Sequence, residues 1–341
     1  MQILFYDVEA QIPYTVLTRL QQGLGGTEAT VTRVAHALAE HHEIFVAQLS
    51  RSIAEERMIR GVTYLSLETA NSLKPDAVIL LKKRQWLEPT ADLFPNARRF
   101  FWLHNIISKD IYYDRKILSA YEIIAVSDFH REHIARRVHG QWHQRLLNNK
   151  SLRYECPPIH RIYNPIDDNL TIDQTPWHSN ELILASSPRK GLQLNLSAFA
   201  EINKIFPEYH LTIATYAPLP ETIQLPNNVT FLGSLPQPEL LQRIRESFCM
   251  FYPQYQDPET FGLVYAESNA VGTPVLAHDF GAAREVLSDP SQLIDGRNIQ
   301  TVIDKMHAWR KQRPIVQAKP EFRLSAVKKA WLDLLNHSEY E

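Results

Sequence analysis

The chain has 341 residues, enough for about two domains, and its 44% hydrophobic and 22% charged residues are ordinary for a globular protein. With 36 Lys and Arg against 38 Asp and Glu, the net charge of −2 argues against a dedicated nucleic-acid-binding protein. No apolar run approaches the ~18 residues of a membrane-spanning helix, and the N-terminus reads as a strand, not as a signal peptide. Because Cys156 and Cys249 also suit a reducing compartment, we expect a cytoplasmic protein.

Apolar runs alternate with helical patterns along the first half of the chain, which predicts a parallel α/β sheet. The predicted strands are residues 3–6, 43–48, 61–66, 75–81, 99–104 and 122–126. Helices are predicted over residues 29–39 and 129–138. The proline-bearing stretch 156–180 has little periodicity, and we interpret it as the connection between two domains.

A second α/β series follows this connection. Its predicted strands are residues 181–185, 210–215, 228–233, 249–253 and 274–277. Its predicted helices are residues 192–206, 239–248, 261–271, 299–309 and 322–335. The fold class predicted is therefore α/β, with two Rossmann-like domains that face each other across a cleft and a ligand at the carboxyl ends of the strands.

The segment 257–267 joins a predicted buried strand to a predicted helix with Gly262 in its first turn. The first N–H groups of a helix lack partners inside the helix, so this junction is a potential anion site. Glu259 lies just before this helix and Glu267 eight residues later, a little over two helical turns, so both can lie on the same side of the element. Carboxylates repel phosphate, so we expect their partners to be the hydroxyl groups of a ribose and a sugar.

Two further segments could meet a phosphate. Arg189 and Lys190 follow a strand and two serines, which suits a diphosphate, although a solvated basic turn fits equally well. Gly25 and Gly26 lie in a glycine-rich loop, but a dinucleotide fingerprint would require a glycine where the chain has Glu28. We interpret this segment as a loop whose backbone N–H groups approach a ligand across the cleft, in preference to a plain turn before a helix.

His104 is expected to end the strand 99–104 at the cleft, where an imidazole can share a hydrogen bond with a ligand hydroxyl near neutral pH. The alternative is a histidine satisfied by local backbone groups, as most of the 14 histidines must be. A basic stretch could bind an anionic membrane surface or acceptor, though a solvated helix face is the more usual explanation. Its cations are Arg131, Arg136, Arg137, Arg145, Lys150 and Arg153.

In these residues, the chain resembles the retaining, nucleotide-sugar-dependent glycosyltransferases of GT-B architecture, family 4 type (glycosyl transferases group 1). The most specific match is Glu259-Thr-Phe-Gly-Leu-Val-Tyr-Ala-Glu267, which resembles the family's Glu-x7-Glu element and continues through residues 270–275 and 281–286. Weaker matches are residues 25–28, 125–127 and 162–167. The resemblance implies a donor that is a UDP- or GDP-sugar and an acceptor that is a carbohydrate or a lipid-linked glycan.

The resemblance also implies roles for single residues. Glu259 would bind the hydroxyl groups of the donor sugar, and Glu267 those of the ribose. Lys190 with Arg189 would neutralise the diphosphate, so that no metal or other cofactor is expected. Backbone N–H groups would reach the sugar and the β-phosphate from Phe261, Gly262 and Leu263, while His104 would line the acceptor side and Gly25 and Gly26 would approach from the opposite domain.

By the same resemblance, residues 1–165 would form the acceptor-binding domain and residues 166–318 the nucleotide-sugar-binding domain. Residues 319–341 would form a helix that returns to the first domain. One position departs from the family, because many members carry arginine where this chain has Ala185. An inactive sugar-nucleotide-binding module and an NAD-dependent oxidoreductase remain as alternatives, as does a peripheral location at the inner face of the membrane.

Overall fold

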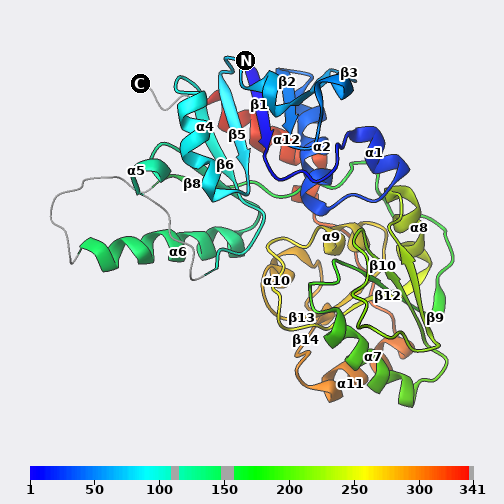
Figure 1. Ribbon diagram of the computed structural model, residues 1–341. Helices are drawn as coiled ribbons and strands as arrows, with labels where there is room; N and C mark the ends of the chain where they lie inside the picture. Colours follow the sequence, from blue (N-terminus) through cyan, green and yellow to red (C-terminus); the bar gives the residue numbers. More distant parts are fainter. Residues whose placement is uncertain (109–114, 147–156, 338–341) are drawn as a thin grey trace. The chain divides into compact units, whose positions relative to one another are not determined.

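The computed structural model describes residues 1–108, 115–146 and 157–337, with only the backbone described for residues 115 and 139–146. Contacts divide the chain into two compact α/β units (Figure 1). The first unit comprises Met1–Val16, Thr27–Pro165 and Leu324–Glu341, and the second comprises Leu17–Gly26 and Ile166–Arg323. The predicted α/β class with two parallel-sheet domains is confirmed.

The first unit is built on a sheet with the strand order β3-β4-β2-β1-β5-β6-β7-β8, parallel except for β3. Its strands are β1 (Gln2–Asp7), β2 (Glu43–Gln48), β3 (Arg57–Ile59), β4 (Val62–Ser66), β5 (Ala77–Leu81), β6 (Arg98–Trp102), β7 (Glu122–Ala125) and β8 (Ile159–Arg161). Its main helices are α2 (Gly26–Leu38), α3 (Leu67–Ala70), α4 (Leu87–Leu93), α5 (Arg115–Leu118), α6 (Asp128–Leu146) and α12 (Leu324–Asn336). The short helix α1 (Val16–Gln21) precedes α2 in the chain, but all of it except Val16 is grouped with the second unit.

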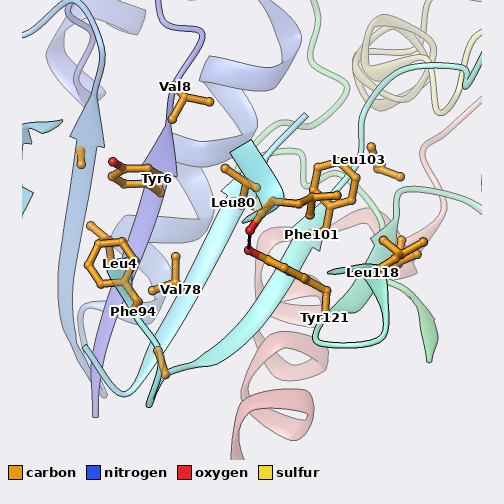
Figure 2. Close-up of a cluster of buried hydrophobic side chains, with 14 of the residues drawn as sticks. Leu4, Tyr6, Val8, Val78, Leu80, Phe94, Phe101, Leu103, Leu118 and Tyr121 are labelled. Atoms are coloured by element: carbon orange, nitrogen blue, oxygen red, sulfur yellow. Dashed lines mark hydrogen bonds between the residues drawn. The ribbon is translucent and has the colours of Figure 1, made fainter. Parts of the chain in front are cut away.

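Alternating strand residues bury both faces of this sheet, because successive side chains of a strand point to opposite sides. One face carries a cluster that includes Tyr6 and Phe101, and there Tyr121 donates a 2.6 Å hydrogen bond to the carbonyl oxygen of Leu87 at the start of α4 (Figure 2). Phe5 and Trp102 instead pack against Trp331 of α12, with a centroid separation of 4.9 Å between the two tryptophans. The C-terminal helix thus completes the core of the first unit.

The second unit has an all-parallel sheet with the order β11-β10-β9-β12-β13-β14. Its strands are β9 (His178–Ala185), β10 (His210–Ala214), β11 (Val229–Gly233), β12 (Ser247–Tyr252), β13 (Val275–His278) and β14 (Leu293–Ile294). Its helices are α7 (Leu192–Ile205), α8 (Gln237–Glu246), α9 (Leu263–Ala270), α10 (Ala283–Val286) and α11 (Ile299–Lys311).

Helices cover both faces of this second sheet. Phe199 of α7 packs edge-on against Phe251, whereas Ser268 of α9 contacts the sulfur of Met250. Adjacent residues of β12 point to opposite faces, so α7 and α9 lie on opposite sides of the sheet. From the central pair, β9 continues outward to β10 and β12 outward to β13, which makes the β9–β12 boundary the topological switch point.

The structure corrects several predicted boundaries. The helix predicted to reach residue 248 ends at Glu246, and the strand β12 begins at once with Ser247. The stretch 156–180 is more than a connection, because it contains β8 and the beginning of β9. The short elements α1 and β3 were not predicted. Among the described residues, none of the helices combines the length and apolarity needed to cross a membrane.

Candidate functional site

Two loops leave the second sheet side by side at its switch point. The strands β9 and β12 are parallel neighbours, with Leu182 opposite Cys249 and Ile183 opposite Met250, so their carboxyl ends lie together. The first loop, residues 186–191, joins β9 to α7, and the second, residues 253–262, joins β12 to α9. Both segments that the sequence singled out for a phosphate and a sugar therefore meet at one edge of one sheet.

An ion pair connects the two loops. The ammonium of Lys190 lies 2.6 Å from one carboxylate oxygen of Glu259. Burial disfavours the charged form of Lys190, but the charge and hydrogen bond of Glu259, with smaller contributions from Tyr216 and Asp257, together raise the pKa of Lys190, so the ammonium stays charged at neutral pH. The Lys190 side chain is 44% exposed and that of Glu259 only 10%. The lysine is thus accessible to an anion, while the carboxylate lies deeper.

The second oxygen of the Glu259 carboxylate has its own donor. Tyr252, the last residue of β12, donates a hydrogen bond of 3.0 Å to it, and the Tyr252 hydroxyl lies 2.9 Å from the hydroxyl of Ser186. Burial raises the pKa of Tyr252 well above 10, so the phenol keeps its proton. The sequence reasoning treated Tyr252 only as part of an apolar strand; its hydroxyl at a carboxyl strand end was the signal that it overlooked.

Gln254 holds the second loop in shape. Its amide oxygen accepts hydrogen bonds of 3.0 Å from the backbone N–H groups of Gln256 and Asp257, and its amide nitrogen donates to the Asp257 carbonyl oxygen at 2.7 Å. The side chain of the buried Asn195 binds the Gln254 backbone N–H at 3.0 Å. Gly191 packs directly on Gln254: a β-carbon at Gly191 would lie 2.6 Å from the Gln254 β-carbon. The two loops are therefore fitted together sterically as well as electrostatically.

The helix α9 begins immediately after Gly262, whose φ of +82° is the left-handed conformation that glycine adopts most readily. As expected, Glu259 lies just before the helix that carries Glu267, but Gly262 precedes the first turn instead of belonging to it. Glu267 is 3% exposed and accepts a 2.8 Å hydrogen bond from the side chain of Gln237 at the start of α8. The sequence reasoning did not identify Gln237.

The neighbouring candidates differ in their environments. Phe261 is buried against Phe322, with ring centroids 5.1 Å apart at 90°. Leu263 is half-buried as the first residue of α9. Arg189 is exposed, and Ala185 is the buried last residue of β9. The structure thus joins Lys190, and not Arg189, to Glu259.

In the first unit, polar residues gather where parallel strands end. Lys82, directly after β5, has a φ of +56° and places its ammonium 3.5 Å from Glu28. His104 is two residues beyond the end of β6, not its last residue as expected, and it is buried. Burial, and then the charges of Lys82 and His130, hold the pKa of His104 well below 6.5, so its imidazole is neutral. Lys82 was not identified from the sequence.

The glycine-rich loop lies mostly outside regular structure. Gly25 is half-buried, and Gly26 is exposed as the first residue of α2. Contacts group Leu17–Gly26 with the second unit, whereas we expected this segment within the first domain. A β-carbon at Gly23 would collide with the Ser234 hydroxyl in the loop between β11 and α8.

Of the predicted basic stretch, the structure describes the side chains of Arg131, Arg136 and Arg137 on α6. Arg131 forms an ion pair with Asp128 at 2.9 Å. The side chain of Arg145, and Lys150 and Arg153 as a whole, lie outside the described residues.

The segment that contains both loops is similar to a known protein family. Residues 185–323, which contain both loops, match the model of the glycosyl transferases group 1. A GDP-mannose-dependent alpha-(1-6)-phosphatidylinositol monomannoside mannosyltransferase from Mycolicibacterium smegmatis is 28% identical over 129 residues, and its counterpart from Mycobacterium tuberculosis is 28% identical over 131 residues. Each match spans 34% of this chain and 34% of the relative's length.

Solved structures share the fold of nearly the whole chain. Sucrose-phosphate synthase from Thermosynechococcus elongatus aligns with a TM-score of 0.71 at 14% identity over 98% of both chains. An alpha,alpha-trehalose-phosphate synthase from Burkholderia vietnamiensis aligns with a TM-score of 0.66 at 12% identity, over 98% of this chain and 99% of that one. Residues 185–323 are therefore similar to the glycosyl transferases group 1, and nearly the whole chain shares the two-domain fold of these solved structures.

Proposed function

We propose that this protein is a retaining glycosyltransferase that moves a sugar from a nucleotide-diphosphate sugar to an acceptor hydroxyl. The observation that carries the proposal is the pairing of Lys190 with Glu259 at the switch point of the second sheet. An accessible ammonium suits a diphosphate, and a buried carboxylate beside it suits the hydroxyl groups of a sugar. The family match over residues 185–323 includes both residues.

The donor would bind along the second loop and α9. Glu259 would accept hydrogen bonds from the sugar, and Glu267, on α9, from the ribose. The backbone N–H groups of Phe261, Gly262 and Leu263 would meet the β-phosphate, because N–H groups at a helix start have no partners within the helix. The left-handed Gly262 supports this role, since it turns the chain sharply into α9.

In the proposed reaction, the acceptor oxygen forms a bond to the anomeric carbon while the bond from that carbon to the β-phosphate oxygen breaks. The nucleoside diphosphate leaves with the electron pair, and the acceptor proton passes to the leaving phosphate oxygen. Lys190, aided by Arg189 and the start of α9, would stabilise the developing negative charge, so we propose that transfer needs no metal ion. With Glu267 assigned to the ribose, no second carboxylate serves as a nucleophile, and we propose front-face attack with retention.

The acceptor is proposed to bind the first domain, where the neutral His104 would contact its hydroxyl group. Gly25 and Gly26 of the glycine-rich loop would approach the transferred sugar. The mycobacterial relatives are named for a GDP-mannose donor and a phosphatidylinositol monomannoside acceptor. We therefore propose a carbohydrate or lipid-linked acceptor, a UDP- or GDP-sugar donor, and a cytoplasmic protein that contacts the inner face of the membrane peripherally. Binding to vesicles with and without anionic lipid tests the membrane contact.

A second candidate is a sugar-nucleotide-binding module without transfer activity. It is favoured by Ala185, a buried alanine where many family members carry an arginine near the diphosphate. Such a module would bind nucleotide sugars in calorimetry, yet it would release no nucleoside diphosphate with any acceptor.

A thermal-shift screen of UDP-, GDP- and ADP-sugars tests donor binding. A donor present at a hundred times its dissociation constant stabilises the folded state by about 2.7 kcal/mol. We expect one nucleotide sugar to raise the melting temperature of the wild type, and Lys190→Ala to lose most of that increase. If no nucleotide sugar shifts the wild type at millimolar concentration, the proposed donor site is wrong.

A further inference from the structure

The orientation of the Glu259 carboxylate depends on a residue that the proposed chemistry has not used. One oxygen of Glu259 is bound by Lys190, whose side chain is flexible and partly exposed. The other is bound by the hydroxyl of Tyr252, which is 1% exposed. We propose that Tyr252, supported by Ser186, is a positioning residue that fixes Glu259 in the orientation required to bind the donor sugar; this inference rests on the proposed function.

Tyr252 is held more rigidly than the group that it binds. It is the last residue of β12, paired in register with Ala277 of β13, and its ring packs edge-on against Tyr265 with centroids 5.6 Å apart. Glu259, by contrast, belongs to the loop between β12 and α9. The hydrogen bond therefore anchors a carboxylate on a loop to a residue of the sheet. A strand holds a binding group in position more precisely than a loop does.

The direction of the hydrogen bonds follows from the chemistry of the groups. An ionised carboxylate only accepts hydrogen bonds, so the single proton of the Tyr252 hydroxyl points to Glu259. The Tyr252 oxygen can then accept from the hydroxyl of Ser186, 2.9 Å away. Ser186 begins the loop that carries Lys190, so the two donors of Glu259 are tied to the same β9–α7 loop.

Removing the Tyr252 hydroxyl would leave Lys190 as the one side-chain donor to the Glu259 carboxylate within the described part of the chain. The terminal torsion of a glutamate is broad, so a carboxylate with one flexible donor can rotate away from the sugar. Because a hydrogen bond to a charged group is worth more than a neutral one, we expect Tyr252→Phe to lower kcat/KM for transfer by about 10- to 100-fold. Binding of the free nucleoside diphosphate, which lacks the sugar, should change less than threefold.

The experiment is a double-mutant cycle on the full chain, measuring transfer with Tyr252→Phe, Glu259→Gln and both together. If Tyr252 acts through Glu259, the phenylalanine costs little once Glu259 has been changed, so the two effects are not additive. Ser186→Ala should give a smaller loss of the same kind. Tyr209→Phe is the matched control, because the buried Tyr209 hydroxyl has no hydrogen-bond partner among the described residues. It should leave transfer unchanged.

If the two losses are additive in the cycle, or if Tyr252→Phe transfers sugar at the full rate, the positioning role of Tyr252 is overturned. The proposed function still stands in that case, provided that the wild type transfers sugar. An equal loss of sugar-nucleotide and free nucleoside-diphosphate binding in Tyr252→Phe also overturns it, because that result indicates general damage to the domain. A folded wild type that transfers no sugar from any donor overturns the proposed function and this inference together.

Discussion

At the scale of single residues, the proposed chemistry of the second unit depends on which cation would face the diphosphate. Arg189 and Lys190 are adjacent in sequence, and the residue pattern alone gave no reason to prefer either. The structure separates them, because Lys190 pairs with Glu259 at 2.6 Å whereas Arg189 is exposed. A lysine already held at the switch point can meet a ligand with less loss of side-chain freedom than a free arginine.

We therefore predict that Lys190→Met weakens binding of a nucleoside diphosphate by at least about tenfold, since a charge-assisted contact to phosphate is worth about 1.5–3 kcal/mol. Arg189→Met is the comparison variant: because the exposed Arg189 is proposed only to aid Lys190, it should weaken binding by less than threefold. Titration calorimetry on both variants measures the difference. Equal losses would show that the two cations share the diphosphate, contrary to the geometry.

The sequence identified Glu259, Glu267 and Lys190 because charged residues near glycines at a strand-to-helix junction form a recognisable local pattern. It overlooked the hydroxyl of Tyr252 at a strand end, and it could not identify Lys82, since the importance of Lys82 lies in a partner elsewhere in the chain. Tyr252 binds a residue seven positions away, and Lys82 approaches Glu28 from a distant strand. Such contacts are created by the tertiary fold and leave no periodic signal.

At the scale of elements, the loop after β9 depends on Gly191. Its φ of +67° disfavours any other residue, and an added β-carbon would also meet the Gln254 side chain at 2.6 Å. Gly233 has a similar φ of +71° but open space around it within 4 Å. A comparison of alanine substitutions at these two glycines therefore separates the destabilisation caused by backbone strain from that caused by a steric collision.

Gly233→Ala should lower the free energy of unfolding by about 1–2 kcal/mol, the cost of a left-handed non-glycine residue. Gly191→Ala should cost at least about 1 kcal/mol more, because packed interiors do not accept an extra carbon without displacement. Chemical denaturation of both variants measures this. Equal losses would contradict the tight packing of Gly191 on Gln254.

The element boundaries show where local sequence signals are insufficient. The helix predicted to extend to residue 248 stops at Glu246 because Ser247 and Phe248 join β12, a strand whose position is set by its neighbours β9 and β13. In the same way, β8 was missed because three residues are too few for a pattern and are held by pairing with β7. The long buried strands and amphipathic helices were predicted well, since their periodicity is local.

The helix α12 is an element of the first unit, although it is distant in sequence. Trp331 is fully buried against Trp102 and Phe5. Trp331→Ala should therefore lower the free energy of unfolding of the first unit by about 3–5 kcal/mol, whereas Lys329→Ala, on an exposed position of the same helix, should cost less than about 0.5 kcal/mol. Hydrogen exchange in β1 and β6 measures the local effect. Unchanged protection would mean that α12 is dispensable.

At the scale of the whole molecule, buried histidines make stability depend on pH. Burial lowers the pKa of His130 to about 4. The charge of His133 adds to this effect, whereas a hydrogen bond to the Asn105 carbonyl oxygen opposes it. Between about pH 6.5 and 4, the unfolded chain therefore binds a proton that the folded chain does not. The stabilisation present above pH 6.5 is lost as the pH falls through this window, and the lowered pKa of His104 acts in the same direction.

Because the pKa of His130 is lowered to about 4, the free energy of unfolding should fall by about 3 kcal/mol between pH 6.5 and pH 4. His130→Gln, which does not titrate, should flatten the pH dependence by a comparable amount. Denaturation at several pH values measures it. An unchanged slope in the variant would show that His130 titrates normally in the folded protein.

The central claim, sugar transfer at the Lys190–Glu259 site, is tested most directly by measuring nucleoside-diphosphate release and glycoside formation from the donor identified by thermal shift. We predict acceptor-dependent release by the wild type, a product with the anomeric configuration of the donor, and a loss of at least about a hundredfold in Glu259→Gln. Transfer that persists at the wild-type rate in both Glu259→Gln and Lys190→Met would contradict the account.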